Sequence, residues 1–454
     1  MKERGRSPYR FFEICIIVFL LSSVFLFGAV QSLVFLSGGV LVFGSFAAFM
    51  IIGMRRGKSW DRTPLFFPFM IFLLSILIQM VPLPSAVLKF LSPQTVALRH
   101  ILGGEGGWNT LSLIPCKTLN QFLRWATVFL LYLFIVNVFT KETVWKLLNA
   151  LFFLTCFEVF YGLFLLFTGS NYLLWYNKLE YGRFGKRLHG TYRNPDHMAG
   201  YLEMLIPLHI VQAISRRVIT PFKSEEKARR LLGIFLVMLF VIALFLTISR
   251  AGIAAFLVGM IYFYFSGIKG PERGTQFSFY LKILGALAVV YLLWIGVGPI
   301  IDRFWSLTSS VQHNRGIVWN DTMKLVEDFP VFGTGFGTFR YIFPKYKTLL
   351  TQGIWDYPHN DYLQMLAEGG VVGLVSFLWL LFNALRMLTW KKDPLARGAA
   401  AGFIAILVHS FFDFNLQIPA NAYIFVTLMA IGWISARENH VPHILPKTRL
   451  TRNG

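Results

Sequence analysis

The sequence predicts an all-α, polytopic membrane protein with about twelve transmembrane helices and one large periplasmic loop. Of its 454 residues, 56% are hydrophobic and only 14% are charged, a balance that water-soluble domains of this length do not show. Many apolar runs reach the roughly 20 residues that a helix needs to cross a hydrocarbon core of about 30 Å. Membrane β-strands would be shorter and would alternate in polarity, so the spans are predicted to be helices.

Each predicted span is an apolar run between polar connections. The first run is interpreted as a retained span, because no small-residue cleavage site follows its basic start. The predicted spans are residues 11–29, 32–53, 65–82, 122–139, 146–168, 197–214, 230–248, 250–267, 280–299, 362–389, 397–414 and 419–436. The predicted organisation is N-terminal helices over 1–184, a core over 185–390 with a periplasmic loop over 300–361, and C-terminal helices with a cytoplasmic tail over 391–454.

The distribution of Lys and Arg gives the predicted orientation. The connections after the second, sixth and tenth spans are short and densely basic, as cytoplasmic connections are. Both termini are therefore predicted to be cytoplasmic, in a bacterial inner membrane. The net charge of +21 then needs no nucleic acid, because the cations lie in short connections and not on one soluble face. The outer connection 169–196 breaks this pattern with Lys178, Arg183, Lys186, Arg187 and Arg193.

Three predicted outer connections, residues 83–121, 169–196 and 300–361, are long and rich in Gly, Trp, Tyr and Asn. Functional side chains concentrate in such loops, so any chemistry is predicted on the outer face. No internal repeat is visible, which disfavours a duplicated transporter. The three cysteines lack the spacing of a disulfide framework or a zinc site.

The first candidate cluster lies at residues 189–197, directly before a predicted span. Arg193 and Asn194 at a helix N-terminus can bind an anion and sugar hydroxyls, since the helix dipole favours negative charge there. Asp196 is predicted to cap this helix, and Glu203 follows near its outer end. The alternative is a polar turn whose cations extend to the membrane interface.

The second candidate is Arg250, in the motif Ser249-Arg250-Ala251-Gly252, where two apolar runs meet with almost no loop. Charges at such a boundary are costly and often functional. The planar guanidinium group suits bidentate binding of phosphate. The alternative is an anchor to lipid headgroups.

The third cluster belongs to the connection 300–361. Arg315 lies near its start, and His359, Asn360 and Asp361 close it, before a long predicted helix that carries Glu368. A neutral imidazole at a helix N-terminus is available as a general base near neutral pH, and Asn360 or Asp361 is predicted to cap that helix. The alternative is a structural loop histidine.

The other patterns in the sequence are not predicted to be catalytic. Residues 332–337, Phe-Gly-Thr-Gly-Phe-Gly, lack the spacing of a nucleotide-binding loop and are interpreted as turns. No metal or other cofactor is predicted, because no pair of histidines or carboxylates has ligand spacing. Glu158, within the fifth span, either pairs with a neighbouring helix or lines a cavity.

In combination, these motifs resemble the O-antigen ligase and polymerase family of bacterial membrane glycosyltransferases. The resemblance covers roughly residues 185–385 and is carried by Gly190-Thr191-Tyr192-Arg193-Asn194-Pro195, Ser249-Arg250-Ala251-Gly252, Arg315, Trp319, Gly333, Gly335, His359-Asn360-Asp361-Tyr362-Leu363, Glu368-Gly369-Gly370 and Gly373. It implies transfer of a glycan from an undecaprenyl-diphosphate carrier to an acceptor hydroxyl, on lipid A-core or another glycan. The reaction would take place at the periplasmic face, without metal or nucleotide.

The resemblance also implies residue roles. His359 is the expected base, the expected diphosphate and substrate ligands are Arg193, Asn194, Arg250, Arg315 and Asn360, and the expected supporting residues are Asp361, Glu203 and Glu368. A diphosphate is a stable leaving group, so cations matter more than a general acid. Direct displacement with inversion is expected, because no carboxylate pair suits a covalent intermediate. Stacking on sugar faces or an interfacial aromatic belt would explain Trp319, Trp355, Tyr357 and Tyr362.

Alternatives stay open at this point. An O-antigen or exopolysaccharide polymerase of the same family differs from a ligase only in its acceptor, and the motifs do not separate the two. A transporter of lipid-linked sugars is disfavoured by the lack of repeat symmetry and by the few charges along the spans. A structural scaffold without activity would make the outer charged clusters incidental.

Overall fold

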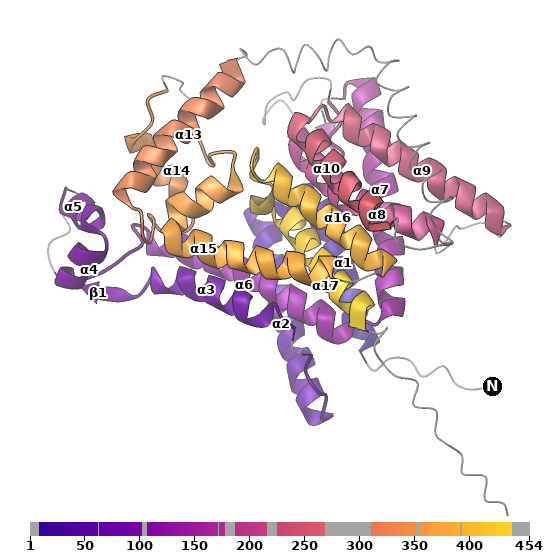
Figure 1. Cartoon of the computed structure of the whole chain (residues 1–454), viewed down its shortest axis with the longest axis horizontal. Coiled ribbons are helices and arrows are strands. Elements are labelled where there is room, and N and C mark those ends of the chain that lie inside the picture. The colour runs from indigo at the N-terminus through magenta and orange to yellow at the C-terminus, as the bar shows by residue number, and fades with distance from the viewer. Residues whose placement is uncertain are drawn as a thin grey trace, which may run out of the picture.

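Helices dominate the computed structural model of the chain (Figure 1). It describes residues 9–61, 63–101, 107–170, 172–177, 187–215, 225–267, 310–349, 354–390 and 393–437. The first elements are α1 Arg10–Phe25, η1 Phe27–Ala29, α2 Ser32–Arg55, α3 Phe66–Ile78, β1 Pro82–Pro84, α4 Ser85–Leu91, α5 Pro93–Ile101, β2 Trp108–Thr110, α6 Pro115–Val138 and α7 Lys141–Thr168. Then follow β3 Tyr172–Leu173, β4 Tyr176–Asn177, α8 Pro195–Ile214, α9 Glu226–Leu246, α10 Arg250–Gly267, α13 Ser310–Asp328, α14 Phe339–Ile342, η4 Phe343–Lys345, α15 Asp361–Thr389, α16 Pro394–His409, η5 Asn415–Gln417 and α17 Pro419–Arg437.

The predicted class, a helical membrane protein, is confirmed. Within the described ranges, seven helices are long and apolar enough to cross a membrane: α2, α6, α7, α9, α10, α15 and α17. The apolar helices α3 and α16 are shorter. Every predicted span coincides with a helix except 280–299, which lies outside the described residues. The total of about twelve spans therefore stays a prediction.

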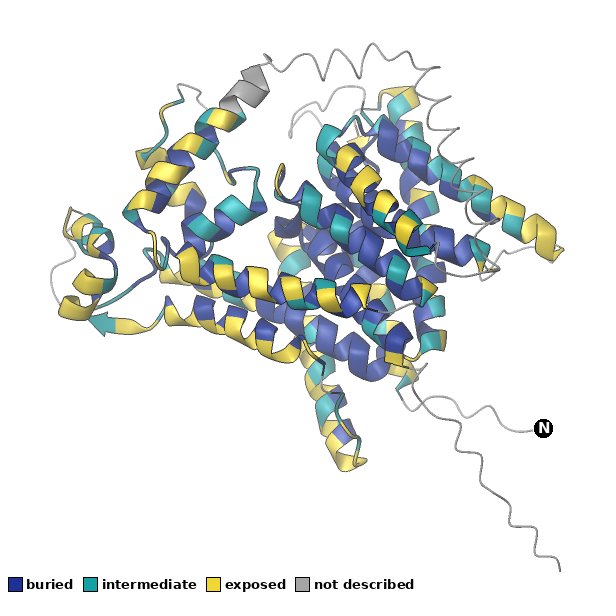
Figure 2. Ribbon diagram, in the orientation of Figure 1, coloured by how far each residue is buried: buried dark blue, intermediate teal, exposed yellow. Residues whose placement is uncertain are grey.

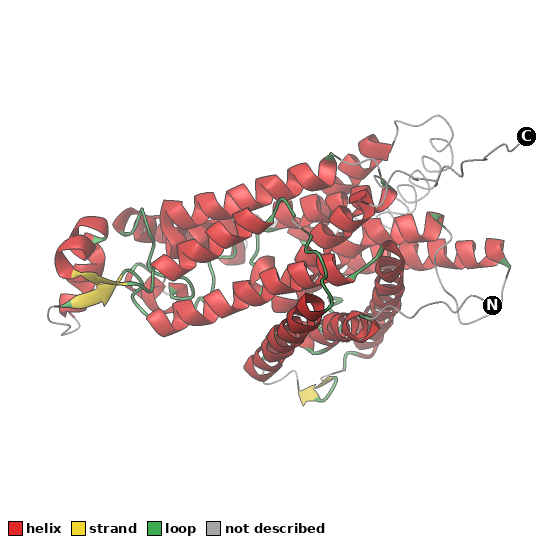
Figure 3. Ribbon diagram, turned by 90° about the horizontal axis from the view of Figure 1, so that it is seen from below, coloured by secondary structure: helices red, strands yellow, loops and turns green. Residues whose placement is uncertain are grey.

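The short strands contribute little to the fold. Strands β1 and β2 pair antiparallel with Pro84 opposite Trp108, and β3 and β4 pair with Leu173 opposite Tyr176. Figure 3 shows both small sheets at the edge of the helical assembly.

The central helices are α8 and α17, whose side chains are nearly all buried. Helix α16 packs against α8, α10 and α17, and α15 lies along α3 (Figure 1). In the apolar window of α17, 94% of the residues are buried, against 17% in that of α2 (Figure 2). One large hydrophobic core runs from Phe12 to Ile434 and so includes residues of all three predicted segments.

The connection 300–361, predicted as one large loop, is partly helical. Its described part holds α13, α14 and η4. Val318 and Leu325 lie on one face of α13, Phe329 directly follows its last residue, and the three form a separate buried cluster with Phe339 and Phe343. Their spacing of seven and four residues is helical, but the helix is too polar to register as a span, so a search for apolar runs misses it.

The glycine-rich segment 332–337 forms turns, as predicted. Gly333 and Gly335 have φ angles of +66° and +105°, a region that L side chains rarely adopt. A Cβ atom on Gly333 would lie 2.3 Å from the carbonyl carbon of Glu368. The backbone N–H of Gly335 donates to the carbonyl oxygen of Glu368 at 3.0 Å. These glycines therefore let the turn lie directly against α15, about two turns from its start.

Candidate functional site

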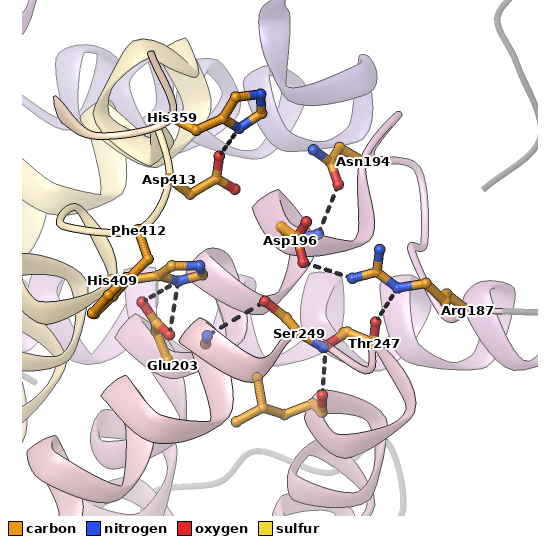
Figure 4. A network of polar contacts seen from close by, with 12 residues as sticks. Arg187, Asn194, Asp196, Glu203, Thr247, Ser249, His359, His409, Phe412 and Asp413 are labelled. Atoms are coloured by element: carbon orange, nitrogen blue, oxygen red, sulfur yellow. Dashed lines mark hydrogen bonds and ion pairs between the residues drawn. The ribbon is translucent and has the colours of Figure 1, made fainter. Parts of the chain in front are cut away.

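The central feature of the candidate site is a pair formed by His359 and Asp413. Nδ1 of His359 lies 2.9 Å from Oδ1 of Asp413, and the two side chains are 23% and 2% exposed. A carboxylate at this distance fixes Nδ1 as the protonated nitrogen, which leaves Nε2 with a free lone pair. Figure 4 shows the second ring nitrogen of His359 pointing away from Asp413. The geometry therefore suits a histidine base oriented by a buried carboxylate.

The charge state of Asp413 fits this arrangement. Burial opposes its ionisation, but the hydrogen bond from His359 and the charges of His197, His359 and His409 outweigh burial. The pKa of Asp413 consequently lies well below its usual range. Asp413 is thus an anion at neutral pH and can stabilise a protonated His359.

Two loops have to meet for this pair to form, and Asp361 joins them. Its backbone N–H donates to the carbonyl oxygen of Ser410 at 2.8 Å, and its Oδ2 accepts from the N–H of Leu416 at 3.1 Å. Arg315, on α13, donates from Nη1 to the carbonyl oxygen of Phe412 at 3.1 Å. Asp361 and Arg315 therefore hold the loop of Asp413 on both sides.

The backbone at His359 is constrained. Its φ angle is +54°, a conformation that costs a non-glycine residue about 1–2 kcal/mol. The next residue, Asn360, caps α15, since its Oδ1 accepts from the N–H of Leu363 at 3.0 Å. The cap and the Asp413 hydrogen bond together fix His359 at the helix N-terminus, as strained residues at functional sites commonly are.

His359 lies in the wall of a cavity of about 710 Å³. The wall also includes the predicted ligands Arg193 and Asn194 and the aromatic residues Trp355 and Tyr357. Its other lining residues are Ala29, Val30, Ser32, Phe35, Leu36, Asn120, Leu123, Arg124, His197, Ile354, Asp356, Phe414, Gln417, Ile418 and Pro419. The lining thus joins the predicted base to two arginines and to a largely apolar wall.

Arg124 is a lining residue that was not among the predicted site residues. It lies on α6 and is buried. Its Nη1 donates to Oε1 of Gln417 at 2.8 Å, and its Nη2 donates to the carbonyl oxygen of Leu416 at 2.6 Å. These bonds fix the guanidinium group in the wall as a positive charge, which suits an anionic ligand.

The cluster at 189–197 is arranged differently from the prediction. Asn194, not Asp196, caps α8, because its Oδ1 accepts from the N–H of Asp196 at 2.9 Å. Asp196 forms an ion pair with Arg187 at 2.6 Å, and Nε of Arg187 donates to the carbonyl oxygen of Thr247 at 2.7 Å (Figure 4). Asp196 sits in the first turn, where Asn194 already supplies the capping oxygen. Arg187, one of the cations in the connection predicted to lie outside, thus has a structural role.

Glu158 also supports this cluster. Its Oε2 accepts from the N–H of Thr191 at 2.7 Å, and its Oε1 accepts from Oγ1 of Thr191 at 2.8 Å. A Cβ atom on Gly190 would lie 2.3 Å from Oε2 of Glu158. Glu158 therefore binds the backbone of the connection that carries Arg193 and is not a lining residue of the large cavity.

The motif Ser249-Arg250-Ala251-Gly252 lies where α9 ends and α10 begins. Helix α9 ends at Leu246 and α10 begins at Arg250, as the near absence of a loop predicts. A Cβ atom on Gly252 would lie 3.2 Å from Cε1 of His409, whose Nδ1 lies 3.0 Å from Oε1 of Glu203 (Figure 4). Both partners of the His409–Glu203 pair are fully buried. The motif thus packs α10 against the helices that carry this pair.

The remaining predicted residues fall into two groups. Arg250 and Arg315 do not line the cavity. Glu368 accepts from the N–H of Phe339 at 3.0 Å through Oε1, and Trp319 donates from Nε1 to the carbonyl oxygen of Pro358 at 2.8 Å. In the structure, Glu368 and Trp319 therefore hold the backbone around the site.

Comparison with known proteins agrees with the motifs. Residues 235–378 match the family model described as O-Antigen ligase. Provisionally named polysaccharide ligases of Rickettsia felis and Rickettsia conorii are each 22% identical over 200 residues, which is 42% of this chain and 48% of each relative. The chain thus matches about half the length of these curated relatives. The predicted resemblance to the O-antigen ligase family is therefore confirmed over residues 235–378, which match the model of that family.

Proposed function

We propose that this protein is an O-antigen ligase-like glycosyltransferase that moves a glycan from an undecaprenyl-diphosphate carrier to a hydroxyl of lipid A-core or another glycan. The observation that carries the proposal is the His359–Asp413 pair in the wall of a 710 Å³ cavity that also includes Arg124 and Arg193. The family match supports the reaction class. Donor, acceptor and mechanism are the proposed part.

In the proposed step, the acceptor hydroxyl oxygen attacks the anomeric carbon of the donor sugar. The bond between that carbon and the phosphate oxygen breaks, and undecaprenyl diphosphate leaves with the electron pair. Nε2 of His359 takes the hydroxyl proton, and the Asp413 carboxylate stabilises the imidazolium that forms. One displacement inverts the anomeric configuration, and the step requires neither a metal nor a nucleotide.

In the second part of the proposal, arginine side chains bind the diphosphate of the donor. Arg124 and Arg193 would bind the diphosphate, whose negative charge grows as the bond breaks. Asn194 would contact the glycan from the same wall. Arg250, Arg315 and Asn360 stay predicted ligands. In the structure, Asn360 caps α15 and Arg315 binds the Phe412 carbonyl, which supports a positioning role for both.

The proposed location is the periplasmic face of a bacterial inner membrane, with both termini in the cytoplasm. The basic connections predicted to be cytoplasmic favour this orientation. In it, His359 precedes α15 on the outer side, where a lipid-linked glycan presents its sugars. A polymerase of the same family would use the same geometry with a lipid-linked glycan as the acceptor.

A gel of lipopolysaccharide and lipid-linked glycan tests the proposal. A strain that lacks the gene would be complemented with the wild type, with His359→Ala, or with Glu327→Gln as a control on the exposed face of α13. If the protein is a ligase, only the wild type and the control should restore the ladder on lipid A-core. Long lipid-linked polymer should accumulate in the strain with His359→Ala. Single repeats on the core would indicate a polymerase. Restoration by His359→Ala would refute the role of His359.

A further inference from the structure

A stripe of exposed apolar side chains runs along one face of α3 and continues beyond its end. The spacing of three and four residues is that of a single helix face. The stripe consists of Phe67, Met70, Ile71, Leu74, Leu77, Ile78 and Val81. In a membrane protein, such a face contacts lipid.

The end of α3 lies near one surface of the hydrocarbon core. Nε2 of Gln79 donates to the carbonyl oxygen of Glu368 at 2.8 Å, which places the two residues at the same level. Gly370 interrupts α15 with a φ angle of +61°, and from Val371 to the end of α15 at Thr389 the helix rises about 27 Å, close to the ~30 Å thickness of the core. His359 precedes α15, so this surface is the one on the His359 side.

The elements that follow Gln79 form a compact unit, which we call the foot: α4, α5 and the antiparallel pair of strands β1 and β2. Ser85 Oγ donates to the carbonyl oxygen of Gly107 at 2.6 Å, and Nη2 of Arg99 donates to that of Ser112 at 2.7 Å. These bonds close the foot on itself. At the end of the molecule drawn at the left of Figure 2, it shows much exposed surface.

The foot exposes several large apolar side chains. Phe90 is 86% exposed, Ile101 78% and Trp108 71%, and Lys89 next to Phe90 is exposed as well. Large aromatic side chains beside a lysine are typical of the zone of lipid headgroups. The lipid-facing stripe of α3 leads directly into this surface, which favours the same bilayer over a separate protein partner.

We propose that the foot lies on the bilayer surface on the His359 side, with Phe90 and Trp108 inserted among the lipid headgroups. The foot is also connected to the candidate site. The N–H of Leu113 donates to the carbonyl oxygen of Thr334 at 3.0 Å, within the glycine turn that packs on α15. Contact with lipid would therefore fix the height of that turn above the membrane. This proposal is independent of the proposed reaction.

Spin labels test it on the full chain in phospholipid nanodiscs. Cys15, Cys116 and Cys156 would be replaced by Ser, and single cysteines introduced by Phe90→Cys or Trp108→Cys. Leu74→Cys on α3 is the lipid reference, and Glu327→Cys on the exposed face of α13 is the aqueous reference. Thermal unfolding of each labelled protein checks that it is folded.

The readout is the collision rate of each label with oxygen, which enriches in lipid, and with a water-soluble nickel chelate. Labels at 90 and 108 should show several-fold less nickel access than the label at 327 and oxygen access close to that at 74. Nickel access equal to that at 327 would overturn the proposal, because the foot would lie in water. Low access to both reagents with an immobilised spectrum would also overturn it, since protein would then cover the foot.

Discussion

Replacing Asp413 by Asn separates the orientation of His359 from its presence. The change keeps the size of the side chain but removes the charge that accepts the hydrogen bond from Nδ1 at 2.9 Å. A hydrogen bond to a charged group contributes about 1.5–3 kcal/mol. If that contribution is realised when His359 becomes protonated, kcat should fall by about 10- to 150-fold. Asp413 does not line the cavity, so the KM values of both substrates should stay near those of the wild type.

The assay is transfer of a lipid-linked glycan by the purified protein in nanodiscs, with kcat and KM measured for the wild type, Asp413→Asn, His359→Ala and the double variant. Loss of a general base typically costs about 10²- to 10⁴-fold. Because Asp413 acts through His359, the double variant should be no slower than His359→Ala alone. Glu327→Gln is the matched control for a carboxylate changed to an amide. Multiplying effects of the two variants would refute the reasoning, and so would a wild-type kcat for Asp413→Asn.

Three further predictions follow from the same contacts. Arg124→Gln should raise the KM for the donor at least about tenfold, because it removes a fixed cation from the cavity wall. Steady-state kinetics measures this, with Lys146→Gln on the exposed surface as the control, and an unchanged KM would exclude Arg124 from donor binding. Gly333→Ala should lower the free energy of unfolding by about 1–3 kcal/mol because of its positive φ angle. Gly316→Ala, in open space on α13, should not lower it. Thermal unfolding compares the two variants, and equal melting temperatures would contradict the prediction. The folded-state pKa of Asp413 lies below its unfolded value of about 4, so its ionisation stabilises the protein above about pH 4 and that stabilisation is lost as the pH falls further. The stability difference between the wild type and Asp413→Asn should therefore shrink in acid, and a constant difference from pH 7 to pH 3 would show that the carboxylate contributes nothing by its charge.

Much of the fold could be predicted because membrane spans impose a simple rule. An apolar run of sufficient length has to be helical, and α2, α6, α7, α9, α10, α15 and α17 follow that rule. The rule does not apply to α13, whose mean composition is polar and whose buried face needs the partners Phe339 and Phe343 from another part of the chain. Tertiary contacts of this kind are not visible in one segment of sequence.

The site was predicted in part, for a related reason. His359, Arg193 and Asn194 lie in recognisable polar motifs between spans, and the structure brings them to one cavity. Arg124 and Asp413 were missed because each falls inside a predicted span, 122–139 and 397–414, where the apolar average conceals a single charge. The charge itself was the available signal, since an ionisable residue within a span is functional by default. In the structure, α16 ends at His409, which places Asp413 in a loop.

Arg124 and Asp413 lie outside the segment that matches the family model. The matched segment 235–378 contains His359 but neither Arg124, Arg193 nor Asp413. The segment by itself would therefore give His359 neither the orienting carboxylate of Asp413 nor the cations Arg124 and Arg193 of the cavity wall. Arg124 reaches Leu416 and Gln417 across 292 and 293 positions of sequence, so α6 and the segment before α17 position each other. In the proposed mechanism, a relative that shares the matched segment alone would have the base, and its flanking helices would have to supply an equivalent carboxylate and equivalent cations. Relatives that use the same mechanism should therefore carry an acidic residue just after the helix that corresponds to α16 and an arginine in the first half of the helix that corresponds to α6.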